Sequence, residues 1–136
     1  MKEEIKKFLD EKEIKYIDYG CYSDERTDYP IYAEKVAKAI QNKECDLGIL
    51  LCKSGAGMTL TANKFKGIRC ATCFNEEVTK ASKADDDINV ITIPAEYLNI
   101  SQVVVIIRRW LATEFKEGRY KERLQMIEEI EKNEMK

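Results

Sequence analysis

The run Asp46-Leu47-Gly48-Ile49-Leu50-Leu51-Cys52 limits the possible folds more than any other segment of the chain. Its apolar residues are continuous instead of alternating with polar ones, a pattern typical of a strand that is covered on both faces. The turn Lys53-Ser54-Gly55-Ala56-Gly57 follows directly, and a helix is expected over about 58–64. Strand, turn and helix in this order favour an α/β protein with a parallel sheet.

Helices and strands are expected to alternate along the rest of the 136-residue chain. Residues 20–28 are expected to form a polar loop, after which Asp28-Tyr29-Pro30 offers a cap and a proline suited to a first helical turn. Ser101 is the expected cap of the fifth helix, and Gly118 separates that helix from the last one. The other helices and strands are predicted from helical spacing and β-branched runs, giving helices at 2–11, 30–42, 76–83, 101–115 and 119–132, and strands at 14–19, 68–74 and 89–93.

These elements predict one domain spanning residues 1–136. The expected architecture is a three-layer α/β sandwich with a Rossmann-like parallel sheet. The last helix, at about 119–132, is long and charged. It either lies on its own domain or reaches a neighbouring subunit.

Composition argues against several classes of partner. Lys and Arg number 23 against 25 Asp and Glu, and the net charge of −2 argues against a nucleic-acid binder, which needs a basic surplus. The longest apolar run, Val103–Ile107, is far shorter than the roughly 18 residues that span a membrane. The start, Met1-Lys2-Glu3-Glu4, has no signal-peptide core, so a cytoplasmic protein is expected. The chain has no histidine, which removes the commonest general acid/base and metal ligand.

The five cysteines do not suggest a disulfide framework, because their number is odd. Cys70-Ala71-Thr72-Cys73 has the spacing of redox and zinc motifs. It lies inside a β-branched apolar stretch and lacks a second ligand pair. We therefore interpret both cysteines as small core residues of a strand.

Cys52 is the best candidate for chemistry, because ligands of parallel α/β sheets bind beyond the carboxyl ends of the strands. We expect it to end the most buried strand. The glycine turn that follows can point backbone amides inward and hold a phosphate, a carboxylate or an enediolate. The same field would lower the thiol pKa from about 8.5 toward neutrality, so that Cys52 works as a base or nucleophile. The alternative is a buried cysteine beside an ordinary strand-to-helix turn.

Arg119 and Arg123 form a second candidate, since residues four apart share one face of a helix. Two guanidinium groups on one face are suited to bind a phosphate. The alternative is a solvated helix face, because charged residues surround both arginines.

Several strings resemble the ribose-5-phosphate isomerase B family, which also includes the galactose-6-phosphate isomerase subunits. The resemblance covers nearly the whole chain. In order, the strings are Ser23-Asp24-Glu25-Arg26-Thr27-Asp28-Tyr29-Pro30, Gly48-Ile49-Leu50-Leu51-Cys52, Ala62-Asn63-Lys64-Phe65-Lys66-Gly67-Ile68-Arg69, Asn89-Val90, and Gly118-Arg119 with Arg123.

The resemblance implies an aldose–ketose isomerase of sugar phosphates that needs no metal or other cofactor and forms dimers, with sites at the subunit interface. A homodimer or homotetramer is expected. The implied roles are a proton-transferring base at Cys52, a turn that stabilises the enediolate at Ser54, Gly55 and Gly57, a substrate contact at Tyr29, further substrate contacts at Asp85 and Asp86, and a phosphate clamp at Arg119 and Arg123.

The chain also departs from this family. Members begin with a strand and a Gly-Ser-Asp-His-Ala-Gly turn, whereas this sequence begins in the helix that follows. Lys53 replaces a glycine for which a positive φ is expected, and Asp85-Asp86-Asp87 replaces His-Asn-Asp. An ionised Asp85 is a poor proton donor near neutral pH, and added carboxylates repel a sugar phosphate.

The family's first strand lies between the strands expected at 14–19 and 47–52. Two alternatives follow: these strands pair directly, or the sequence is shorter than the natural product. Asp85 and Asp86 precede their strand and Cys52 ends its own, so a site that contains both, together with Arg119 and Arg123, is expected to be built from two subunits.

The sequence thus leaves two functions open. One is a working isomerase that acts through a Cys-assisted enediolate. The other is an impaired homologue that binds a phosphorylated sugar or serves only as a subunit. A Rossmann nucleotide binder is disfavoured, because no strand is followed by Gly-x-Gly-x-x-Gly.

Overall fold

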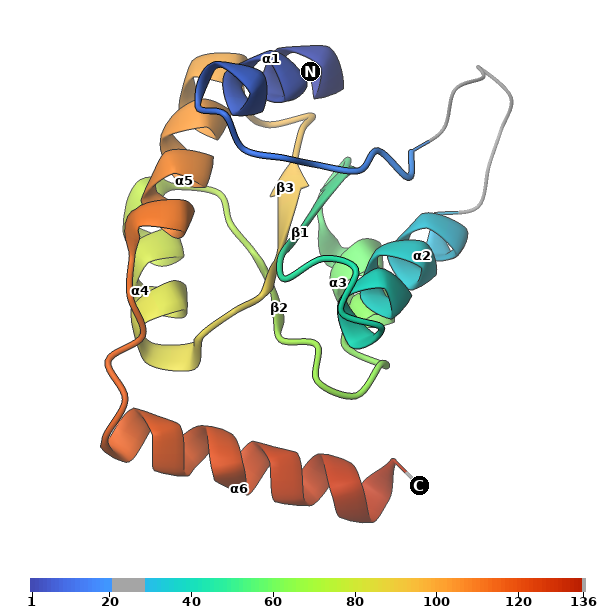
Figure 1. Ribbon diagram of the computed structural model, residues 1–136, viewed down its shortest axis with the longest axis vertical. Coiled ribbons are helices and arrows are strands. Elements are labelled where there is room, and N and C mark those ends of the chain that lie inside the picture. Colours follow the sequence, from blue (N-terminus) through green and yellow to red (C-terminus); the bar gives the residue numbers. More distant parts are fainter. Residues whose placement is uncertain (21–28, 136) are drawn as a thin grey trace.

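The structure is a computed structural model and describes residues 1–20 and 29–135. Its three-stranded parallel sheet has the order β1-β3-β2, formed by β1 (Gly48–Cys52), β2 (Cys70–Thr72) and β3 (Val90–Pro94) (Figure 1). All five residues of β3 are buried, whereas β1 is only partly buried. The predicted parallel sheet is confirmed. The expectation that Cys52 ends the most buried strand is wrong, because β3 has a paired strand on both sides and β1 has a described strand on one side only.

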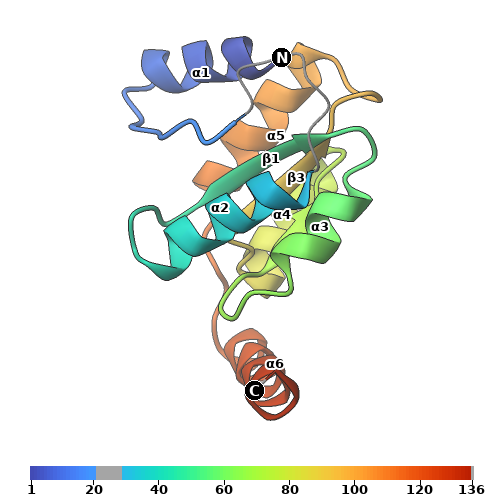
Figure 2. The same cartoon turned by 90° about the vertical axis from the view of Figure 1, so that its right-hand side faces the viewer.

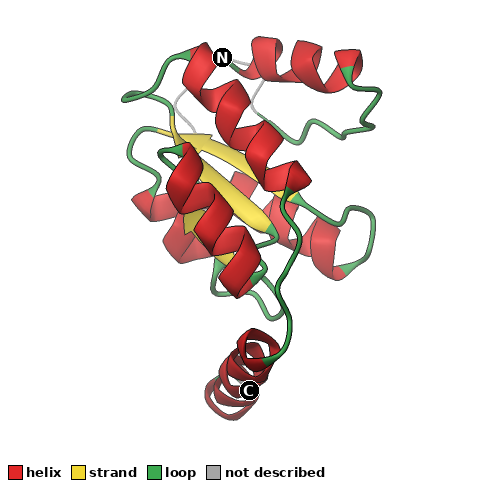
Figure 3. Cartoon of the chain, turned by 90° about the vertical axis from the view of Figure 1, so that its left-hand side faces the viewer, coloured by secondary structure: helices red, strands yellow, loops and turns green. Residues whose placement is uncertain are grey.

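Helices cover both faces of the sheet and complete the predicted three layers (Figures 2 and 3). Helices α2 and α3 pack on one face, and α1, α4 and α5 lie on the other. Helix α6 lies beyond one end of the sheet (Figure 1). The helices are α1 (Lys2–Glu11), α2 (Pro30–Gln41), α3 (Ala56–Ala62), α4 (Glu76–Asp86), α5 (Ile100–Ala112) and α6 (Arg119–Glu134).

Alternate residues of each strand supply two separate cores. Ile91 and Ile93 of β3 pack with the α1, α4 and α5 layer, and Val90 packs with the α2 and α3 layer. The largest fully buried side chain is Trp110 of α5, whose indole N–H donates a 3.1 Å hydrogen bond to the Ile88 carbonyl. Because both faces of the sheet are covered, the ends of the strands are where a ligand can approach.

The expected strand at 14–19 is not formed. The segment follows α1 as irregular chain, with the Ile14 amide bonded to the Leu9 carbonyl and the Ile17 side chain 55% exposed. A strand needs a hydrogen-bonded neighbour, and none of the three strands pairs with this segment. Direct pairing of 14–19 with β1 is therefore wrong. Within residues 1–20 and 29–135, the edge of β1 that faces away from β3 has no paired strand.

Several helix ends differ from those expected. Asn99, not Ser101, caps α5: its side chain accepts from the Gln102 amide, and the Gln102 side chain accepts from the Asn99 amide, both at 2.9 Å. Helix α5 ends at Ala112, three residues before the expected end, because Thr113 is extended. Pro30 occupies the first turn of α2 as expected. The Asp28 cap and most of the expected loop at 20–28 lie outside the described residues.

The loop between α3 and β2 is held by side-chain amides at the amino end of the sheet. Asn63 exchanges two 2.9 Å hydrogen bonds with the backbone of Cys70. Asn89 accepts from the Arg69 amide at 2.8 Å and donates to the Gly67 carbonyl at 2.9 Å. These bonds give the Ala62–Arg69 string and Asn89 a structural role.

Candidate active site

The turn after β1 presents the first group of candidate residues. Cys52 is partly exposed at the end of the strand, and Lys53 and Ser54 are exposed beyond it. Gly55 is buried and adopts φ +91°, whereas Lys53 is not among the residues with positive φ. The expectation that Lys53 occupies a position needing positive φ is therefore wrong, because Gly55 takes the left-handed conformation of this turn. The Ser54 hydroxyl accepts a long 3.4 Å bond from the Ala56 amide.

Tyr29 lies against the same turn. It is the N-cap residue of α2, and its side chain is 49% exposed. A Cβ built on Gly57 would lie 2.5 Å from Cζ and 2.7 Å from the hydroxyl of Tyr29. Gly57 thus allows the tyrosine ring to approach the start of α3 closely. Tyr29 therefore packs against the turn that contains Ser54, Gly55 and Gly57 and that follows Cys52.

The protonation of Cys52 differs from the expectation. Burial raises the pKa of the Cys52 thiol above its usual value, and a hydrogen bond from the backbone of Gly55 opposes this rise only in part. The prediction of a thiol pKa lowered toward neutrality is wrong, because loss of solvation outweighs the turn amide.

A second group of candidates gathers at the end of α4. Asp85 forms a 2.9 Å ion pair with Lys116, and the Lys116 amide donates to the Ala84 carbonyl at 2.9 Å. The hydrogen bond to Asp85 raises the pKa of Lys116, so the ammonium form is favoured. Asp86 is the exposed last residue of α4. The charge of Asp85 is thus compensated by a lysine that the sequence analysis did not single out.

Arg119 and Arg123 lie on the exposed first turns of α6 and surround the ring of Tyr120. Their guanidinium carbons are 5.6 and 5.4 Å from the ring centroid, and the Lys116 ammonium lies 4.9 Å from it. Three cations therefore cluster at the start of α6, near the Asp85 carboxylate. Among the residues that the structure describes, neither arginine forms an ion pair with a carboxylate.

The two groups lie at opposite ends of the sheet within one chain. Cys52 is at the carboxyl end of β1, whereas the end of α4 leads into the amino end of β3, where α6 also lies (Figure 1). The structure therefore brings the cysteine, tyrosine and glycine residues together and separates them from the aspartates and arginines. The predicted placement of Asp85 and Asp86 away from Cys52 is confirmed.

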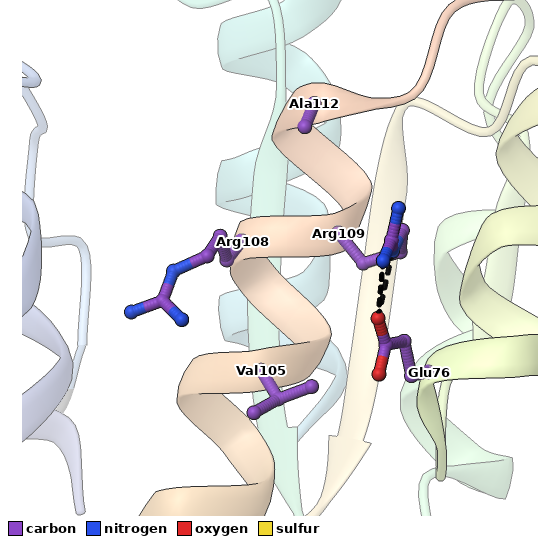
Figure 4. A pocket seen from close by; sticks show the side chains of 5 residues that line it. All are labelled: Glu76, Val105, Arg108, Arg109 and Ala112. Carbon is purple, nitrogen blue, oxygen red and sulfur yellow. Dashed lines mark hydrogen bonds and ion pairs between the residues drawn. The ribbon is translucent and has the colours of Figure 1, made fainter.

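An open groove of about 350 Å³ between α4 and α5 lies outside both groups. Figure 4 shows Arg109 directed at Glu76, with which it forms an ion pair, and Arg108 pointing away from both. Its side chains do not converge on a common point, so the groove presents no set of groups that could bind one ligand together.

The remaining motifs carry no ligand chemistry in the described part of the chain. Cys70 and Cys73 are buried core residues as interpreted, although only Cys70 lies in a strand and Cys73 follows the end of β2. Across residues 1–20 and 29–135, no cluster of three or more cysteine, aspartate or glutamate side chains is arranged to hold a metal ion. No described helix is both long and apolar enough to cross a membrane.

A parallel α/β domain with a thiol, a tyrosine and a glycine turn at its strand ends is a small-molecule binding protein of the kind that receives ligands beyond the carboxyl ends of the sheet. A profile described as "Ribose/Galactose Isomerase" matches residues 1–127. The chain belongs to this family, which confirms the resemblance to ribose-5-phosphate isomerase B that the sequence indicated.

Named relatives support the same assignment. Ribose-5-phosphate isomerase B of Escherichia coli is 37% identical over 131 residues, covering 96% of this chain and 88% of the relative. The structure of ribose-5-phosphate isomerase B from Clostridium thermocellum matches with a TM-score of 0.94 at 37% identity, covering 97% of this chain and 89% of the other. The Mycoplasma genitalium enzyme with bound ribulose-5-phosphate matches with a TM-score of 0.90 at 32% identity, covering 96% and 87% of the two chains.

Proposed function

We propose that this protein interconverts the aldose and ketose forms of a sugar phosphate, with ribose 5-phosphate as the first substrate to test. The observation that carries the proposal is the partly exposed Cys52, which precedes the glycine turn against which Tyr29 packs, in a chain of this family. Relatives named ribose-5-phosphate isomerase B support the choice of substrate.

In the proposed reaction, Cys52 acts as the base. Its thiolate removes the proton from C2 of the open-chain aldose, and the electron pair of that C–H bond forms the C1–C2 double bond of an enediolate. The thiol then returns the proton to C1, while a proton moves from the C2 hydroxyl to O1, which gives the ketose. Backbone amides of the turn at Ser54, Gly55 and Gly57 stabilise the negative oxygen.

The phosphate is proposed to bind Arg119 and Arg123 of a second subunit. Both arginines are exposed, and both lie at the far end of the sheet from Cys52 of their own chain. A homodimer, or a homotetramer built from such dimers, would place the two groups at one site. Asp85 and Asp86 accompany the arginines and would face the sugar.

The proposal is tested by converting ribose 5-phosphate to ribulose 5-phosphate with the purified chain and with Cys52→Ala. Turnover should be present in the wild-type protein and lost in the variant. Cys45→Ala is the matched control, because Cys45 is a partly exposed cysteine outside both groups of candidates. Absence of turnover by the wild-type protein with pentose and hexose phosphates would overturn the proposal, as would full activity of Cys52→Ala. Unchanged turnover in excess chelator is also expected.

A second candidate function is an impaired homologue that binds a phosphorylated sugar or serves only as a subunit. It is favoured by Asp85, whose carboxylate forms an ion pair with Lys116 at 2.9 Å. Calorimetric titration with ribose 5-phosphate would then show binding without turnover. Turnover by the isolated chain would exclude this alternative.

A further inference from the structure

Three threonines from three elements meet beneath Gly55. Thr59 belongs to α3, Thr72 ends β2, and Thr92 is fully buried in β3. Their Oγ1 atoms are separated by 3.0 Å (Thr59 to Thr72), 2.7 Å (Thr59 to Thr92) and 3.1 Å (Thr72 to Thr92). We call these residues the threonine triangle. Its hydroxyl groups connect α3, β2 and β3 to one another and to the turn after β1.

Gly55 rests directly on the threonine triangle. The Thr59 hydroxyl donates a 2.7 Å hydrogen bond to the Gly55 carbonyl, which also accepts from the Thr59 amide at 3.0 Å. A Cβ at Gly55 would lie 2.8 Å from Cγ2 of Thr72 and 3.2 Å from Oγ1 of Thr92. The triangle therefore fixes the orientation of the peptide unit after Gly55 and leaves no room for a side chain.

The donor pattern within the triangle follows from the inventory of a hydroxyl group. Thr59 has one hydroxyl hydrogen, and the Gly55 carbonyl takes it. The Thr59 oxygen can then accept from Thr72, while Thr92, which also has a single hydroxyl hydrogen, donates either to Thr59 or to Thr72. Hydrogen bonds arranged in such a chain polarise one another and hold their members more firmly than isolated pairs.

Gly55 also interacts with the candidate base, Cys52. Its backbone makes a hydrogen bond to the Cys52 thiol that favours the negatively charged form of sulfur. The amide belongs to the peptide unit before Gly55, and the carbonyl bonded to Thr59 belongs to the unit after it. A change in the backbone angles of Gly55 would therefore move the amide away from the sulfur.

We propose that Thr59, Thr72 and Thr92 are positioning residues that hold Gly55 so that its amide stays directed at the Cys52 sulfur. The catalytic meaning of this arrangement rests on the proposed isomerase function. The arrangement itself is measurable without turnover, through the reactivity of the Cys52 thiol.

The test is the pH profile of Cys52 alkylation by iodoacetamide, followed by peptide mass spectrometry. Thr59→Val removes the hydroxyl at nearly constant shape, and Thr59→Ser keeps it. Thr61→Val is the matched control, because the Thr61 hydroxyl makes an equivalent 2.9 Å bond to the Gly57 carbonyl outside the triangle. Cys73, which is fully buried, reports in the same digest whether a variant has opened the fold.

We expect the alkylation midpoint of Cys52 to rise by about 0.5–1 pH unit in Thr59→Val, which corresponds to a three- to tenfold slower reaction at a fixed lower pH. Thr59→Ser and Thr61→Val should retain the wild-type profile. Thr72→Val, which changes a residue at the end of β2, should shift the alkylation midpoint in the same direction. It replaces Thr59→Val as the test variant if Thr59→Val does not fold. Wild-type profiles in folded Thr59→Val or Thr72→Val would overturn the inference.

Turnover assays separate this inference from the proposed function. If the wild-type chain isomerises ribose 5-phosphate, Thr59→Val should lower kcat more than it raises KM, and Thr59→Ser should restore kcat. If the wild-type chain has no turnover, the proposed function fails, while the alkylation profiles still decide whether the triangle positions Gly55.

Discussion

At the scale of single residues, Gly55 meets two demands at once. Its φ of +91° is a left-handed conformation that costs other residues about 1–2 kcal/mol, and its α-carbon faces Thr72 without space for a methyl group. We predict that Gly55→Ala lowers the free energy of unfolding by about 2–3 kcal/mol, as measured by urea denaturation.

Gly67→Ala is the control for the backbone term alone. Gly67 has φ +81°, but nothing lies within 4 Å of a Cβ built on it. Gly67→Ala should lower the free energy of unfolding by about 1 kcal/mol. Equal losses for the two variants would show that the contact with Thr72 does not constrain the turn.

The buried Cys70 thiol predicts a loss of stability at alkaline pH. Burial raises its pKa from 9.0 to about 12. Above pH 9 the unfolded chain releases this proton while the folded chain retains it, so the stability present below pH 9 falls by about 1.4 kcal/mol per pH unit until the folded thiol ionises. Urea unfolding at about pH 8 and about pH 10, with reductant, should show a smaller decrease in Cys70→Ala. An equal decrease in both proteins would contradict the prediction.

The candidate residues differ in how far the sequence could place them. Cys52, Gly55 and Gly57 follow each other in one short turn, so their proximity was predictable from local order. Thr59, Thr72 and Thr92 are up to 33 residues apart, and no periodic pattern marks them as neighbours. The pKa direction of Cys52 was also missed, because it depends on how much solvent the packed helices exclude.

At the scale of elements, the start of α5 offers two residues that could cap the helix. Ser101 and Asn99 are both residue types that cap helices, and the sequence alone favoured Ser101. The structure assigns the cap to Asn99, paired reciprocally with Gln102. We predict that Asn99→Ala lowers the free energy of unfolding by about 1 kcal/mol, whereas Ser101→Ala changes it by less than about 0.5 kcal/mol. The reverse order in thermal or urea unfolding would contradict the assigned cap.

The elements that depend on local patterns were predicted well, and the one that depends on a distant partner was not. The apolar runs around β1, β2 and β3 identified all three strands, with ends shifted by at most two residues. The segment 14–19 has strand-like composition, yet it remains irregular because a strand requires a neighbour to satisfy its amides. Composition cannot supply that information.

At the scale of the whole molecule, the separation of Cys52 from Arg123 predicts complementation between subunits. Cys52→Ala and Arg123→Ala should each be nearly inactive. In a mixed dimer, one of the two sites would combine an intact cysteine with an intact arginine. Random reassociation of equal amounts should therefore restore about a quarter of the wild-type sites.

The measurement is ribose 5-phosphate turnover after the two variants are unfolded together and refolded, with native mass spectrometry to count mixed oligomers. Refolding each variant alone is the control. Mixed oligomers without any recovered turnover would show that the cysteine and arginine do not share a site across subunits.

The single tryptophan gives all these stability measurements one optical reporter. Trp110 is 1% exposed, bonded through its indole to Ile88 and lies 5.7 Å from the Lys83 ammonium. Its fluorescence emission should be blue-shifted in the folded protein and move to longer wavelength as water reaches the ring. Since α5 contributes to the larger of the two cores, that spectral change reports the unfolding of this core rather than fraying at a terminus.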